Sequence, residues 1–83
     1  MRARDVRPGS TIRVNRTFHD VDGQEISAGR VFTLARLEVA FYTGGHTFHF
    51  TDGTVIRLGD GIGESDAILE DADGVYWAMT PEG

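Results

Sequence analysis

The sequence contains no cysteine and no lysine. The lack of cysteine excludes disulfide bonds, thiolate zinc sites and cysteine nucleophiles, and the lack of lysine excludes the phosphate loop that needs a lysine side chain. No apolar run approaches the roughly 18 residues that span a bilayer, and the first residues lack the apolar segment of a secretory signal. We therefore expect a soluble, cytoplasmic protein that does not contact a membrane.

The chain has 83 residues, which is enough for one domain and too few for two. A quarter of these residues are Val, Ile, Leu or Phe, a larger share than in chains that stay disordered. We predict a single small β-rich domain over residues 1–83. Because a core of this size leaves little free energy to spare, homodimer formation or a bound partner would add stability.

Charge is distributed unevenly along the chain, whose net charge is −5. Residues 1–16 carry five arginines against one aspartate, and residues 60–83 carry seven carboxylates and no basic side chain. Two interpretations remain open. The charges either solvate two faces of a soluble protein, as most surface charges do, or form a basic contact surface at one end and an acidic one at the other.

Apolar residues that alternate with polar ones between frequent glycine turns predict short β-strands. Residues 10–15 and residues 46–51 both show this period of two, which is typical of strands with one buried face. A third strand over residues 54–58 follows the Asp52-Gly53 pair. We therefore expect a hairpin with a two-residue turn at that pair.

Residues 30–42 are too many for one ordinary strand and are rich in β-branched and aromatic side chains. Their alternation changes phase, with apolar residues at even positions in the first half and at odd positions in the second. Because one extra residue reverses the inward parity, we predict a bend or bulge near Ala35-Arg36. A helix over residues 31–41 is the alternative.

Only residues 65–73 favour a helix, of about two turns. Ser65 is placed to cap its N-terminus, and Gly74 is placed to close its C-terminus. The acidic residues at its end oppose the helix dipole, so we expect this helix to depend on the packing of Ile68 and Leu69.

The order of elements resembles that of an SH3-like barrel, in which a long loop follows the first strand and a glycine-marked turn precedes the second. Here Ala28-Gly29-Arg30 resembles that turn. A narrower pattern resembles small bacterial domains of unknown function, and it consists of Phe18-x-Asp20-x-Asp22-Gly23, Gly29, Tyr42-x-Gly44, Phe50 and Ile56-Arg57-Leu58. The resemblance implies a fold but no activity and no catalytic residue.

We therefore predict a mainly β fold, either a small SH3-like antiparallel barrel or a strongly bent sheet of five to six strands. One short helix near the C-terminus completes it, and residues 75–79 return as a last strand or extended segment. The predicted core consists of Ile12, Val14, Phe32, Leu34, Phe48, Phe50, Ile56, Leu58, Ile68 and Leu69. Five aromatic side chains, Phe18, Phe32, Phe48, Phe50 and Trp77, are expected in the core rather than on a stacking surface.

Two loops resemble ligand-binding motifs without matching them. Residues 20–25 look like a shortened calcium loop, but Gly29 stands where the full loop has a glutamate, so a turn held by aspartate side chains is favoured. Residues 59–64 lack the third glycine of the dinucleotide fingerprint and are acidic. We predict neither a cofactor nor a metal ion, and no catalytic residue.

The leading functional hypothesis is a non-enzymatic protein-interaction module with an acidic C-terminal face. Its partner would have a basic, nucleic-acid-binding surface, and one version is a phage or mobile-element inhibitor that mimics nucleic acid. The predicted contact residues are Asp60, Glu64, Asp66, Glu70, Asp71, Asp73 and Tyr76. One alternative is nucleic-acid binding through Arg2, Arg4, Arg7, Arg13 and Arg16.

A second alternative is a metal- or ligand-binding enzyme that uses His19, His46 and His49 with Asp20. His46 and His49 are three residues apart on a predicted strand, which places them on opposite faces and argues against a shared metal ion. We therefore consider enzymatic activity the weakest of the three classes.

Overall fold

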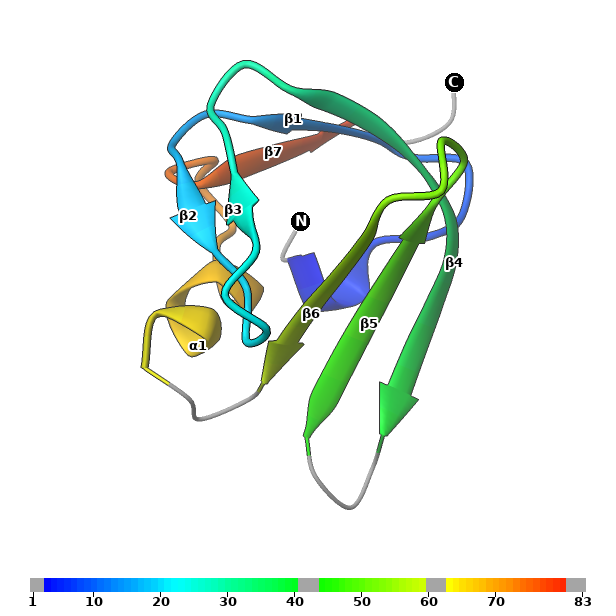
Figure 1. Cartoon of the computed structure of the whole chain (residues 1–83). Coiled ribbons are helices and arrows are strands. Elements are labelled where there is room, and N and C mark those ends of the chain that lie inside the picture. The colour runs from blue at the N-terminus through cyan, green and yellow to red at the C-terminus, as the bar shows by residue number, and fades with distance from the viewer. Residues whose placement is uncertain (1–2, 41–43, 60–62, 81–83) are drawn as a thin grey trace.

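The computed structural model describes residues 3–40, 44–59 and 63–80 (Figure 1). In chain order its elements are the 3-10 helix η1 (Ala3–Asp5), the strands β1 (Thr11–Val14), β2 (Phe18–His19), β3 (Glu25–Ile26), β4 (Val31–Ala40), β5 (Gly45–Phe50) and β6 (Val55–Gly59), the helix α1 (Gly63–Leu69) and the strand β7 (Trp77–Thr80). The fold is mainly β, as predicted.

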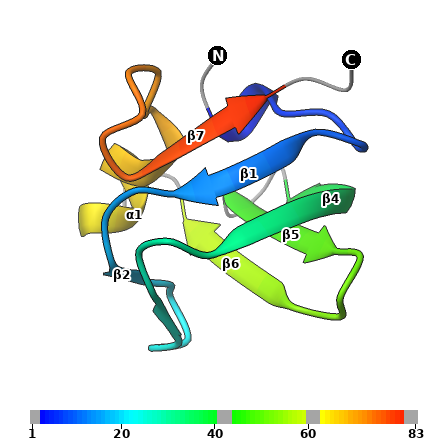
Figure 2. The same ribbon diagram turned by 90° about the horizontal axis from the view of Figure 1, so that it is seen from above.

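Five strands form one antiparallel sheet in the order β6-β5-β4-β1-β7. Because β6 and β7 lie at opposite ends of this order, the sheet is bent but does not close into a barrel. The bent-sheet form of the prediction is therefore confirmed. The long connection between β1 and β4 contains the two-stranded sheet of β2 and β3, which projects beside the main sheet (Figure 2).

The bend lies in β4, at the predicted position. Leu34 pairs with Phe50 and Arg36 pairs with His49, so Ala35 is an extra residue in the ladder. The first half of β4 pairs with β1 and the second half with β5, and the strand curves from one layer into the other (Figure 1). Leu37 packs against the core, as the reversed parity requires. The helix alternative for this segment is wrong.

The core lies between the two halves of the bent sheet and is closed by α1 and η1. All ten predicted core side chains are buried, as are the five aromatic ones. Trp77 is central, because its ring contacts both Phe48 and Phe18 at centroid distances of 5.2 Å. Its indole Nε1 also donates to the Ile68 carbonyl oxygen at 3.3 Å, which joins β7 to α1. The prediction omitted Ala3, Val6 and Ile26, which are buried too.

The hairpin of β5 and β6 is confirmed, but its turn has three residues instead of two. The Phe50 N–H donates to the Thr54 carbonyl oxygen, and the Gly53 N–H donates to the Phe50 carbonyl oxygen. Gly53 has a φ of 90°, whereas Asp52 keeps a negative φ. This is a type I turn closed by a left-handed glycine, because an aspartate adopts the positive φ of a two-residue turn less readily.

The helix starts and ends earlier than predicted. Helix α1 begins at Gly63, so Ser65 is inside it and is buried on the same stripe as Ile68 and Leu69 rather than capping the helix. After Leu69 the chain leaves the helix, and Gly74 lies in a later turn, where its carbonyl oxygen accepts from Asn15 Nδ2 at 2.9 Å. The helix ends early because an aspartate side chain binds the following backbone in another conformation.

Candidate functional site

The aspartate that follows the helix is Asp71. It is buried and lies two residues after the end of α1. Its Oδ1 accepts the backbone N–H of Val75 at 3.0 Å, and its Oδ2 accepts those of Tyr76 at 2.8 Å and Trp77 at 3.1 Å. Burial by itself would raise the pKa of Asp71, but these donors outweigh burial and hold the pKa below its ordinary value. The carboxylate thus fixes the loop between α1 and β7.

The predicted acidic residues therefore divide into two groups. One group is accessible to solvent: it consists of the exposed Glu64, Glu70 and Asp73 and the half-buried Asp66. The other is Asp71, which is buried and accepts hydrogen bonds from the backbone. Residues 66, 70 and 71 do not share one helix face, because α1 ends at Leu69 and not at residue 73 as predicted. Asp60, another predicted contact residue, lies outside the described residues.

Tyr76 stands half-buried at the end of this loop, beside β1 and β2. Its ring meets the ring of Phe18 edge to face, at a centroid distance of 6.3 Å. The guanidinium of Arg16 lies 5.3 Å from the centroid of the Tyr76 ring, a cation–π geometry. Tyr76 thus contacts the core through Phe18 and contacts Arg16 at the end of the loop between α1 and β7.

The 3-10 helix near the start of the chain packs against α1. Helix η1 contacts α1, and Ala3 and Val6 are both buried in the core. The 3-10 helix η1 and α1 are therefore neighbours in the fold although they are far apart in the sequence.

The exposed arginines also divide into two groups. Arg36 pairs with Glu38 at 3.1 Å, and Arg57 approaches Asp22 Oδ2 at 3.5 Å. Within residues 3–40, 44–59 and 63–80, no ion pair is formed by four other exposed arginines, namely Arg7, Arg13, Arg16 and Arg30. Three members of the second group, Arg7, Arg13 and Arg16, belong to the arginines named in the nucleic-acid alternative, and Arg13 lies on β1.

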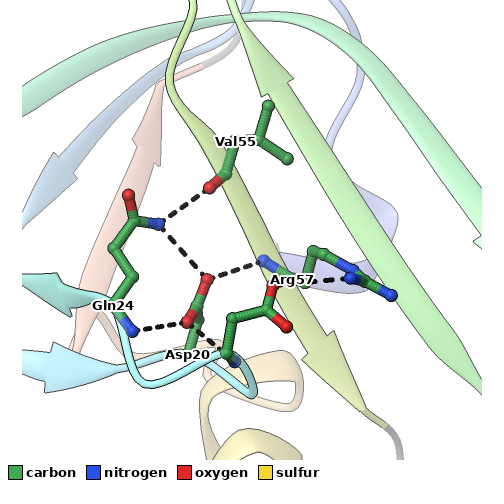
Figure 3. A network of polar contacts seen from close by, with 5 residues as sticks. Asp20, Gln24, Val55 and Arg57 are labelled. Atoms are coloured by element: carbon green, nitrogen blue, oxygen red, sulfur yellow. Dashed lines mark hydrogen bonds and ion pairs between the residues drawn. The ribbon is translucent and has the colours of Figure 1, made fainter.

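Asp20 holds a second polar network, shown in Figure 3. Its Oδ1 accepts the N–H groups of Asp22 and Gln24, at 3.0 and 2.9 Å. Its Oδ2 accepts the Gln24 side-chain amide at 3.2 Å and the backbone N–H of Arg57, also at 3.2 Å. The same amide donates to the Val55 carbonyl oxygen at 2.8 Å. The turn between β2 and β3 is thus held by an aspartate, as predicted, and it also binds the edge of β6.

The three histidines do not form a common site. His46 is buried on the inner face of β5, and His49 lies on the outer face beside Glu38, so the predicted opposite orientation is confirmed. His19 is exposed on β2, 3.8 Å from Glu25. No group of three or more His, Cys, Asp or Glu side chains in the described part of the chain could hold a metal ion. The described geometry therefore gives a metal site built from the three histidines no support.

Sequence reasoning missed the contact of Asp20 with β6 and the role of Asp71, and these two are the buried aspartates among the described residues. The only local signal was spacing, since Asp20 precedes by two and four residues the backbone N–H groups that it accepts. Asp71 reaches four to six residues ahead, which no sequence motif indicated.

No protein-family model, curated protein or solved structure matches this chain. The resemblance to small bacterial domains with an SH3-like barrel stays a prediction. In the described segments no helix combines the length and the apolar character that a membrane crossing demands.

Proposed function

We propose that this chain is a non-enzymatic protein-interaction module, which presents an acidic surface to a basic partner. We define the acidic surface as Glu64, Glu70, Asp73 and Tyr76. The observation that supports the proposal is the rigid support behind these residues. Ile68 and Leu69 anchor α1 in the core, and the Asp71 carboxylate holds the loop that carries Asp73 and Tyr76. A preorganised surface loses less entropy on binding than a mobile one.

The partner would carry arginine and lysine side chains, as nucleic-acid-binding surfaces do. Residues 60–83 contain seven carboxylates and no basic side chain. Charge complementarity of this kind speeds association and selects the partner. A module that occupies a nucleic-acid-binding surface in this way acts as an inhibitor by mimicry.

The test is capture of partners from a lysate of the native cells by the immobilised full chain. One variant reverses charge on the acidic surface, with Glu64→Arg and Asp73→Arg, and the matched control neutralises the opposite charge, with Arg7→Gln and Arg13→Gln. We expect one partner to be bound by the wild type and the control, lost by the reversed variant, and displaced by added nucleic acid. Equal capture by the reversed variant, or loss in the control alone, would refute the proposal.

A second candidate function is nucleic-acid binding, and the unpaired arginines favour it. Arg7, Arg13 and Arg16 are exposed around β1 and, among the residues described, have no carboxylate partner. The net charge of −5 opposes this function. A gel shift at about 50 mM salt, where phosphate contacts are strongest, separates the two candidates. A shift that the Arg7→Gln and Arg13→Gln variant abolishes would favour nucleic acid.

A further inference from the structure

The outer face of β4, β5 and β6 has a row of positions with almost no side chain. His46 and Phe48 on β5 point inward, so Gly45 points outward. The ladder pairs Gly45 directly with Gly59 on β6, which is buried and so breaks the alternation of that strand. Ala40 on β4 pairs with Gly45 from the other side. Three adjacent positions therefore leave the backbone of the sheet uncovered by long side chains.

A hollow of about 190 Å³ opens over this row. Its lining includes Ala40, Gly45 and Gly59 together with Val21, Thr47 and Arg57, and it also reaches His46 and Leu58. Thr47 and Arg57 form the next pair along the ladder, so their side chains also point outward and border the hollow. Val21 is fixed there because its N–H donates to the Arg57 carbonyl oxygen at 2.9 Å.

The shape and chemistry of the hollow suit a flat ring that carries an anionic group. An engineered cavity of about 150 Å³ binds benzene, so this volume accepts one ring with a small substituent. Ala40, Gly45 and Gly59 carry no long side chain, so a flat ring can approach the sheet at these positions. The Arg57 guanidinium is exposed and lies 3.5 Å from its only carboxylate partner among the described residues, Asp22, so it retains N–H donors.

We propose that this hollow binds a small aromatic carboxylate, with the ring over Gly45 and Gly59 and the carboxylate at Arg57 and Thr47. The site is separate from the acidic surface and does not depend on the proposed function. Arginine suits this role because its planar donors match a carboxylate.

The test uses benzoate as the probe on the full chain labelled with ¹⁵N, with benzyl alcohol and acetate as comparison compounds. We expect saturable shifts of the backbone amide signals of Gly45, Thr47 and Arg57 with benzoate. Benzyl alcohol should bind several-fold more weakly because it lacks the charge, and acetate should give no saturable shift because it lacks the ring. No saturation with benzoate, or equal shifts with acetate, would overturn the proposal.

Two variants locate the site. Gly45 does not have a positive φ, so Gly45→Val is compatible with the strand and places a side chain in the hollow. We expect it to weaken benzoate binding at least tenfold. The exposed variant Arg57→Gln, which keeps the fold intact even if Gly45→Val does not, should remove the preference for benzoate over benzyl alcohol. Val31→Thr, on the other half of the sheet, is the control. If Arg57→Gln keeps the wild-type preference for benzoate over benzyl alcohol, the proposed site is wrong.

Discussion

The carboxylate of Asp20 accepts the backbone N–H of Arg57 at 3.2 Å, across 37 positions of sequence. β6 is the last strand at its end of the sheet, so its outer edge has no strand partner within the described fold. The turn between β2 and β3 covers that edge with one carboxylate, one amide and one backbone N–H group (Figure 3). Covered edges protect sheet proteins from pairing with other chains.

The first prediction follows from this contact. Asp20→Ala should lower the free energy of unfolding by roughly 2–3 kcal/mol, because four N–H donors lose a charged acceptor in a buried place. Urea denaturation measures the loss. The control is Asp22→Ala, which removes only an exposed ion pair and should cost less than about 1 kcal/mol. Equal losses in the two variants would show that Asp20 does not hold the edge.

The second prediction concerns pH. The folded-state pKa of Asp71 lies below that of the unfolded chain, which is about 3.9. The Asp71 carboxylate therefore contributes its full share of the free energy of unfolding above that pH. This stabilisation is lost as the pH falls toward the folded-state pKa. At neutral pH the wild type should exceed Asp71→Asn in stability by roughly 2 kcal/mol, since an amide cannot replace a carboxylate that accepts three N–H groups.

Urea denaturation of both proteins at several pH values tests this prediction. The stability difference between them should narrow below about pH 4, because the wild-type carboxylate then becomes protonated. The other acidic groups are common to both proteins and cancel in the difference. A gap that stays constant or widens in acid would mean that the Asp71 carboxylate does not act through its charge.

The third prediction concerns the hairpin turn. A Cβ atom added at Gly53 meets nothing within 4 Å, but the φ of 90° is strained for other residues. Gly53→Ala should therefore cost about 1 kcal/mol in stability, and Gly53→Asn should cost less, because asparagine tolerates left-handed conformations. Thermal denaturation distinguishes the two. If the larger asparagine is the more damaging residue, the cause is steric and the turn has another geometry.

The sheet could be predicted from the sequence because its cause is local and repetitive. Alternation assigned the inward side chains of β1, β5 and β6, and the phase change at Ala35 located the bulge in β4. The predicted helix boundaries were wrong for two reasons. Gly63, with a φ of 45°, allows the helix to start earlier, and the Asp71 side chain imposes an earlier end.

The candidate site was predicted less well, for a physical reason. An aspartate in a glycine-rich acidic segment is most often solvated, so the sequence placed Asp71 with the exposed carboxylates. Its actual partners are backbone N–H groups, which donate to the carboxylate and face it only after β7 has joined β1. The contact of η1 with α1 is likewise a tertiary effect, since no local pattern relates residues 3–5 to residues 63–69.

The most direct test of the acidic surface is calorimetric titration of the captured partner against three proteins. These are the wild type, the Glu64→Arg and Asp73→Arg variant, and the Arg7→Gln and Arg13→Gln variant. We expect the reversed variant to bind at least about tenfold more weakly, with a stability change under about 1 kcal/mol, and the arginine variant to bind as the wild type does. Unchanged affinity in the reversed variant would contradict the proposal that this protein acts through its acidic surface.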